Sequence, residues 1–302
     1  MHHIGEFAAL LTAFFWTVTA ITFEAASRKI GSMVVNILRL IIGFIFLSVF
    51  VFFYRGYLFP VDASLHNLLW LSLSGLIGFT FGDLCLFQSF VLIGARVSML
   101  VMALAPPMTA FFAWIVLGEK LSLQSWMGMA VTMTGIALVV LKRNGEGEKN
   151  GIFSSMKFSY PLWGLLLAFG GALGQAAGLV LSKVGMQGYD TFASTQIRVM
   201  AGTAGFMVIY SFMGKWKDVF RGMTHFRPMA LLSLGAFFGP FLGVSFSLLA
   251  IKYADTGIAS TIMAIVPVLI IPPSIILYRE KVSLKEIIGS VLAVGGVGIF
   301  FL

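Results

Sequence analysis

Three ionisable residues interrupt long apolar stretches of this 302-residue chain, namely Arg39, Asp83 and Arg198. A charged side chain at the centre of a bilayer costs about 3 kcal/mol or more, so such residues are functional candidates by default. If their segments are helices that rise about 1.5 Å per residue, Asp83 and Arg39 differ in depth by only about 5 Å. We predict that the two form an ion pair and that Asp83 exchanges between Arg39, a bound solute and a proton. A permanent structural pair is the open alternative.

Arg198 corresponds to Arg39 in the second half of the chain, 159 residues later, where the neighbouring apolar stretches hold no acid. We expect its side chain to reach the membrane surface or to bond backbone carbonyls. Trp16 and Gln175 are also 159 residues apart and could face one shared centre. There an indole would stack on a planar solute while an amide binds its polar end. Packing of Trp16 against lipid or the core is the alternative.

Aromatic residues are predicted to form a wall around the acid. Phe79, Asp83, Phe87 and Phe90 share one face of a helix, and Gln88 lies nearby. This pattern is typical of an apolar pocket with few polar groups, although a chain with 30 phenylalanines can also produce it by chance. The residues predicted to bind the solute are Trp16, Asp83, Phe87, Gln88 and Gln175.

The composition predicts that these residues lie in a membrane protein. Hydrophobic residues make up 59% of the chain and charged residues 11%, with a mean hydropathy of +0.98, whereas about a quarter of an ordinary soluble domain is charged. The net charge of +8 comes from Lys and Arg in short loops, which indicates membrane topology and argues against nucleic-acid binding. Cys85 is the only cysteine and the four histidines are scattered, so we expect no metal, no cofactor and no intramolecular disulfide.

Ten apolar stretches have the length of a tilted membrane-spanning helix. The loops between them are short, except for 142–161 and 214–228. A polar linker at 142–160 separates a first five-helix unit, 1–141, from a second, 161–302. The sequence therefore predicts an all-α integral membrane fold with spans at 4–23, 33–53, 68–92, 95–117, 124–141, 161–182, 192–213, 229–250, 256–277 and 284–302.

The two units align with each other as a duplicated sequence. Residues 78–141 match 239–302 without a gap at a constant offset of 161, and Pro106 falls on Pro267. Because each unit has an odd number of helices, the second must enter the membrane from the opposite side, which gives an inverted repeat. Pro106 and Pro267 favour kinks in their helices, where they would act as gates or as static bends.

Small residues predict where helices approach each other closely. Gly78 and Gly82 are spaced as in the G-x-x-x-G pattern, and so are Gly170, Gly174 and Gly178. Such spacing places small residues on one helix face, where two backbones can come into contact. We expect these glycines to form packing seams and to take no direct part in ligand chemistry.

The most telling segment is GDLCLFQSFVLIGARVSMLVMALAPPMTAFFAWIVLGEKLSLQSWMGM at 82–129, with a weaker copy at 243–290 in which GEKLS becomes REKVS. Over both halves and nearly its whole length, the chain resembles the EamA-type family of the drug/metabolite transporter superfamily. The resemblance implies ten helices, a central cavity between the halves, and transport, often export, of small organic solutes. The second copy departs from the first with Arg279 for Gly118 and Val244 for Asp83, so its cavity wall need not mirror the first.

We therefore expect a secondary transporter that moves amino acids or related small metabolites, mainly outward, across a bacterial inner membrane by alternating access. The chain has no P-loop, which leaves ion coupling, with a proton as the candidate, or facilitated diffusion. The expected partners are the solute, the proton and the bilayer, and a monomer can be functional although a dimer is compatible. A membrane-embedded enzyme of lipid or sugar-lipid metabolism is the alternative, and a sensor or assembly subunit is a third.

The orientation of the chain is left open by two conflicting signals. Loops after odd-numbered spans hold 14 Lys and Arg residues, and the other loops hold four. Cytoplasmic loops are enriched in Lys and Arg, which would place both termini outside. The family resemblance instead implies that both termini lie in the cytoplasm.

Overall fold

The computed structural model describes residues 3–120, 122–140, 160–278 and 283–299. Within these ranges the regular structure is entirely helical and contains no strand, as the composition and periodicity predict. Six helical stretches are long and apolar enough to cross a membrane, and a bent pair of helices makes a seventh. The all-α membrane class is thus confirmed at this level.

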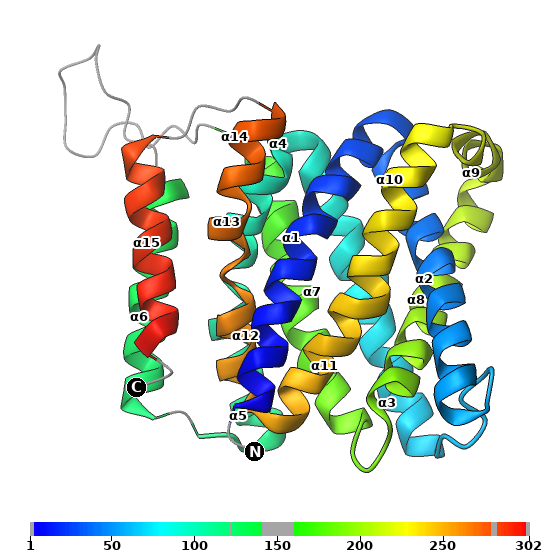
Figure 1. Ribbon diagram of the computed structural model, residues 1–302, viewed down its shortest axis with the longest axis horizontal. Coiled ribbons are helices and arrows are strands. Elements are labelled where there is room, and N and C mark those ends of the chain that lie inside the picture. The colour runs from blue at the N-terminus through cyan, green and yellow to red at the C-terminus, as the bar shows by residue number, and fades with distance from the viewer. Residues whose placement is uncertain (1–2, 121, 141–159, 279–282, 300–302) are drawn as a thin grey trace.

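The helices stand side by side in an upright bundle (Figure 1). In the first half they are α1 (Ile4–Ile30), α2 (Ser32–Arg55), α3 (Leu65–Gly75), the π-helical stretch η1 (Leu76–Asp83), α4 (Leu84–Met102), α5 (Ala105–Leu117) and α6 (Leu123–Val140). In the second half they are α7 (Leu162–Gly185), α8 (Thr191–Met213), α9 (Trp216–Met223), α10 (Phe226–Ala236), the π-helical stretch η2 (Phe237–Gly243), α11 (Val244–Tyr253), α12 (Thr256–Met263), α13 (Val266–Leu269), α14 (Ile271–Tyr278) and α15 (Leu284–Gly298). We call the end that holds the α1–α2 turn the upper end and the opposite end the lower end.

Within the described residues the predicted spans lie largely on helices, but two of the predicted breaks between them differ in the structure. The expected break at 93–94 is a turn inside α4, where Gly94 has a φ of +79° that favours glycine. The expected loop at 214–228 contains α9, which bends by 117° from α8. The predicted linker at 142–160 lies, except for Tyr160, outside the described residues.

Helix irregularities recur at the offset found in the sequence. The π-helical stretches begin at Leu76 and Phe237, which are 161 residues apart. Short turns also interrupt the helices just before Pro106 and Pro267, because a proline has no N–H to continue the ladder and is best placed in the first turn of a new helix. The predicted kinks are therefore helix breaks.

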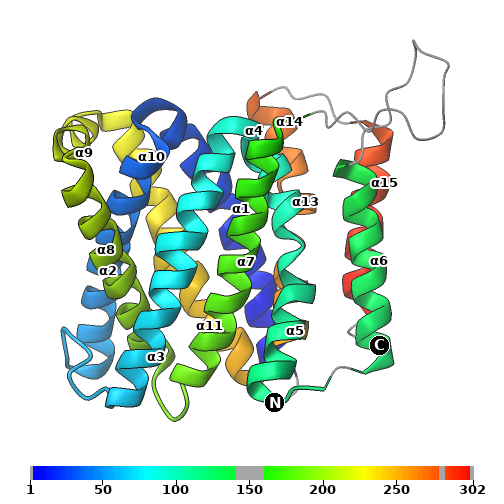
Figure 2. The same ribbon diagram turned by 180° about the vertical axis from the view of Figure 1, so that it is seen from behind.

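Glycines form the close helix contacts that the sequence predicts. A Cβ built on Gly174 would lie 2.5 Å from the Cα of Gly82, and one on Gly178 would lie 3.0 Å from the Cα of Gly78, so α7 and η1 touch through their backbones. At one side of the bundle α6 and α15 pair in the same way (Figure 2), with Gly296 against the backbone oxygen of Gly128. Because glycine has no side chain, these residues let the helix backbones come into contact and so determine how closely the helices pack.

Two adjacent glycines of α15 test this packing with a matched control. A Cβ on Gly296 would meet Thr132 and Gly128, whereas one on Gly295 would meet nothing within 4 Å. Gly296→Ala should therefore destabilise the fold by about 1–3 kcal/mol through overpacking, while Gly295→Ala should be neutral or slightly stabilising because alanine favours helix. The thermal unfolding midpoints of the two purified variants in detergent report the difference. Equal midpoints would contradict the packing of α6 on α15.

Candidate functional site

A cavity with about 70 Å³ of water-accessible space lies in the middle of the bundle, between helices of both halves. A second cavity, with about 30 Å³ of such space, shares Trp16, Met99, Met102 and Gln175 with the first, so the two adjoin. Apolar side chains line most of both. The first cavity is lined by Trp16, Thr19, Ala20, Arg39, Phe79, Asp83, Leu86, Phe87, Phe90, Met99, Met102, Gln175, Gly239 and Val244.

An ion pair between Arg39 and Asp83 provides the charge of this cavity. Arg39 lies in α2 and Asp83 is the last residue of η1, and the Nη2 of Arg39 donates a hydrogen bond to a carboxylate oxygen of Asp83. Asn36 joins the pair, since its Oδ1 accepts from the Nε of Arg39 at 3.1 Å and its Nδ2 donates to the backbone oxygen of Asp83 at 3.1 Å. The predicted ion pair is therefore present, with a bridging asparagine that the sequence did not single out.

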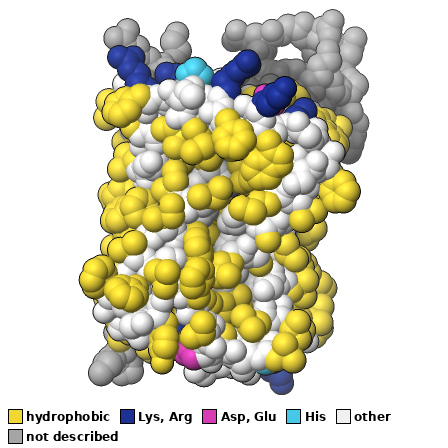
Figure 3. Space-filling model, turned by 90° about the vertical axis from the view of Figure 1, so that its right-hand side faces the viewer, with side chains coloured by type: hydrophobic (Ala, Val, Ile, Leu, Met, Phe, Trp, Pro, Cys, Tyr) yellow, Lys and Arg dark blue, Asp and Glu magenta, His cyan; other side chains and the backbone are white. Residues whose placement is uncertain are grey.

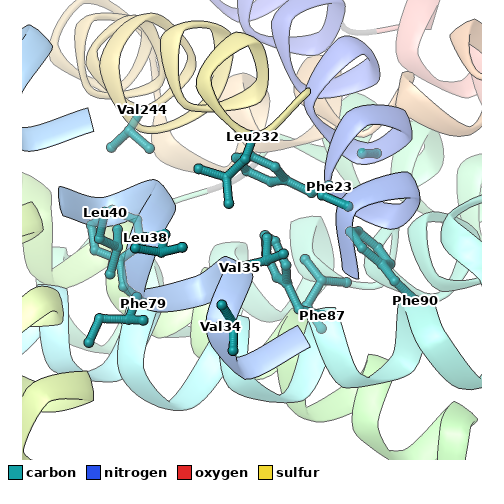
Figure 4. Packing of buried hydrophobic residues seen from close by; sticks show 14 of the residues in the cluster. Phe23, Val34, Val35, Leu38, Leu40, Phe79, Phe87, Phe90, Leu232 and Val244 are labelled. Carbon is teal, nitrogen blue, oxygen red and sulfur yellow. The ribbon is translucent and has the colours of Figure 1, made fainter. Parts of the chain in front are cut away.

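Aromatic rings surround the guanidinium of Arg39. Its Cζ lies 4.5 Å from the ring centre of Phe87, 5.7 Å from that of Phe23 and 5.8 Å from that of Phe79. Figure 4 shows Phe23 of α1 near Phe87 and Phe90 of α4, with Phe79 of η1 on the other side of the cluster beside Leu38 and Leu40. Such contacts attract a cation by about 0.5–2 kcal/mol each and exclude water from the pair.

The side chain of Arg198 is buried and does not reach the surface, which was one of its two predicted positions. Only 3% of the residue is exposed, and its Nε has no hydrogen-bond partner among the described residues. Its Cζ stacks at 4.9 Å from the ring centre of Phe79, and the absence of a side chain at Gly78 leaves room for its Nη2. Phe79 thus lies between two guanidinium groups that share one nearby carboxylate, Asp83.

The structure brings most of the other predicted site residues together. Trp16 and Gln175 line both cavities, Phe87 lines the first, and Pro106 and Pro267 line the second. Gln88 does not line either of them, because it points to the α1–α2 turn and its Oε1 accepts a hydrogen bond from Ser32 at 2.6 Å. The face that carries Asp83 and Phe87 cannot also carry Gln88, which is one residue further along the helix.

Glu119, the acid of the GEKLS segment, forms a second polar centre that the sequence did not single out. Its carboxylate accepts hydrogen bonds from the backbone N–H and the hydroxyl of Thr256, at 3.0 and 2.8 Å, at the start of α12. The Nζ of Lys183 in α7 lies 2.8 Å from the same carboxylate and donates to the backbone oxygen of Ala254. This cluster ties α5, α7 and α12 together at the lower end. The recurring Glu-Lys dipeptide was the available signal.

Comparison with known proteins decides the family of this chain. The sequence profile of the family described as "EamA-like transporter family" matches residues 3–141 and 162–302 of the chain. The chain belongs to the EamA-like transporter family. This EamA-like chain is 24% identical over 237 residues to human solute carrier family 35 member G1, a match that covers 78% of the chain and 62% of that relative. The matched part therefore spans less than two thirds of the human protein.

The EamA-like chain also shares its fold with a protein of known crystal structure. The two superpose with a TM-score of 0.70 at 18% sequence identity, over 99% of this chain and 98% of the other. The apolar helices and the family together identify an integral membrane protein of a transporter family.

The buried ion pair makes a stability prediction for this EamA-like protein. Asp83→Asn removes the charge that compensates Arg39, so it should destabilise the fold by about 3–5 kcal/mol. Combining it with Arg39→Gln should cost less than the sum of the two single changes, because neither charge is then left alone. Thermal unfolding of the wild type, both single variants and the double variant in detergent gives the coupling energy. Strictly additive losses would show that the two side chains do not interact.

Proposed function

We propose that this protein is a secondary transporter that moves small organic metabolites across the membrane by alternating access through the central cavity. The observation that carries the proposal is the cavity itself. It is lined by helices of both halves, is largely apolar, and holds a buried ion pair. Buried ionisable residues in membrane helices are expensive and commonly mark a solute or ion pathway.

The proposal includes ten membrane spans in two inverted five-helix repeats, 1–141 and 161–302, joined by a linker at 142–160. The repeated π-helical stretches and helix breaks support it, as does the separate family match to each half. Contacts across the bundle are also reciprocal. Gly78 packs on Gly178 of α7, and Gly239, its counterpart 161 residues later, packs on Thr19 of α1. One chain then contains a complete pathway, so a monomer suffices.

The charges near the cavity favour a solute that carries a carboxylate. Arg39 and Arg198 lie close to Phe79, and Asp83 neutralises only one of them. An anionic group at the edge of Phe79 would compensate the second guanidinium, and Trp16 and Gln175 would contact the apolar and amide-binding parts of the solute. Amino acids and related metabolites fit this description. Asp83 would release Arg39 on accepting a proton, which couples the solute to proton flow.

The cluster around Glu119 supports the alternating-access part of the proposal. α5 and α12 line the second cavity with Thr109 and Ser260, and both run from there to the lower end. Their lower ends are held together by Glu119 and Thr256. The helix breaks before Pro106 and Pro267 lie at the other ends of these segments. Release of the cluster and bending at the breaks would open the cavity toward the lower end, with export across a bacterial inner membrane as the physiological direction.

Flux measurements with a matched variant test this proposal. Aromatic amino acids, aliphatic carboxylates and organic cations are first screened for thermal stabilisation of the purified protein, and uptake of the best solute into proteoliposomes is then measured with and without a pH gradient. We expect a carboxylate-bearing solute to be taken up, with acceleration by the gradient. Asp83→Asn should slow uptake by about tenfold or more, whereas Cys85→Ala, two residues away and directed at Gly170 of α7, should not.

Two results would contradict the proposal. Unchanged flux through a normally expressed Asp83→Asn variant would remove Asp83 from the mechanism and leave a permanent structural pair. Failure of every solute class to cross, in vesicles where the protein is folded, would contradict transport itself.

A further inference from the structure

The upper end of the bundle carries a short helix that lies across the spanning helices. α9 bends by 117° from α8, and its apolar residues Trp216, Val219, Phe220 and Met223 recur at the spacing of one helix face. Val219 is buried on the bundle, while Phe220 is 64% exposed and the following Phe226 is 85% exposed. A helix with this direction and this pattern lies in the plane of a membrane surface, with its exposed rings among the acyl chains.

A cavity with about 320 Å³ of water-accessible space opens between α9 and the α1–α2 turn, beside the contact of Gly222 with Val34. Three permanent cations, Lys29, Lys215 and Arg221, line it together with His225, and Asp218 is the only acid among its lining residues. Among the residues that the structure describes, none of the three cations has a carboxylate within 4.0 Å, in contrast to Arg28 next to Lys29, which pairs with Glu24. The cavity therefore concentrates uncompensated positive charge in a concave site.

We propose that this cavity binds the phosphate headgroup of an anionic phospholipid. An arginine and two lysines supply charge-assisted hydrogen bonds of the kind that phosphate oxygens accept. Figure 3 looks at this side of the molecule and shows basic side chains along the upper rim, directly above a wall of hydrophobic side chains. A lipid satisfies both parts at once, since its headgroup fills the cavity and its chains run along the wall.

The surface beside the cavity favours a lipid over a free anion. Phe212, Phe220 and Phe226 are the most exposed large apolar residues near α9, at 89%, 64% and 85%. A dissolved phosphate would leave these rings without a partner, whereas acyl chains cover them. The bound headgroup would bridge Lys29 at the end of α1 to Lys215 and Arg221 of the α9 region, and would hold α9 against the bundle.

The test compares two double variants that remove equal charge. Lys215→Ala with Arg221→Ala removes two of the three permanent cations that line the cavity, whereas Lys217→Ala with Arg227→Ala removes two cations from the same region that do not line it. The full-length protein in detergent is titrated with phosphatidylglycerol, with phosphatidylcholine of the same acyl chains, or with inorganic phosphate. The thermal unfolding midpoint and the number of lipids that remain bound in native mass spectrometry are measured.

Phosphatidylglycerol should raise the midpoint of the wild type and remain bound as a defined adduct, while phosphatidylcholine and inorganic phosphate should not. Each cation near a membrane surface contributes roughly fivefold to the affinity for an anionic headgroup, so the cavity variant should need roughly 25-fold more phosphatidylglycerol for the same shift. The control variant should titrate nearly like the wild type.

Three outcomes would overturn the proposal. Equal losses in the two double variants would show nonspecific attraction to a basic face, and an equal effect of inorganic phosphate would show a site for free anions. An unchanged titration of the cavity variant would show that the cavity does not bind the headgroup. The lipid-free midpoint and the adduct count distinguish lost binding from a misfolded variant.

Discussion

A guanidinium and a carboxylate buried in the middle of an apolar bundle impose the main constraint on this structure. In hydrocarbon neither charge is tolerable alone, so the helices that carry Arg39 and Asp83 must meet at one depth and in one rotation. Asn36 fixes that rotation further, because it binds the side chain of one partner and the backbone of the other. The cavity owes its polar end to this arrangement, and the surrounding phenylalanines keep water from replacing the pair.

The two halves of the chain share helix irregularities but differ in the residues that line the cavity. Helix irregularities recur at a fixed offset, namely the π-helical stretches and the breaks before Pro106 and Pro267. The chemical residues differ, with Val244 in the place of Asp83 and Gln175 in the place of Trp16. Arg198 consequently has no acid at the corresponding position of its own half, and its guanidinium stacks on Phe79. The charged residues that line the cavity, Arg39 and Asp83, both come from the first half of the chain.

The sequence predicted what hydropathy and helix geometry determine. The helical class, the depth match of Arg39 and Asp83, and the positions of Trp16 and Gln175 follow from apolar length, rise per residue and repeat register. It missed what depends on tertiary contacts. Arg198 was expected at the surface or on backbone carbonyls, because the aromatic ring and the acid near it lie in a helix distant in sequence. Gln88 was assigned to the cavity because proximity along the chain was taken for a shared face.

Two further differences had local signals. The apolar spacing in α9 is that of an amphipathic helix, but eight residues between two spans resemble a loop by length alone. Glu119 is an ordinary turn residue by type, and only the fold shows that Thr256 and Lys183 converge on it from the other half. In both cases the sequence contained the residues but not the neighbours that give them a role.

The most direct test of this account measures whether water-soluble reagents reach the central cavity, because all other conclusions about transport depend on that access. Cys85 is the only cysteine, so Cys85→Ala provides a cysteine-free background in which Gln175→Cys places a single thiol in the lining of both cavities. The account predicts that a membrane-impermeant thiol reagent labels this residue, that labelling occurs from one side of the membrane in a given state, and that a transported solute changes the rate. No labelling from either side in the folded protein, under any condition, would contradict a cavity that opens alternately to the two faces of the membrane.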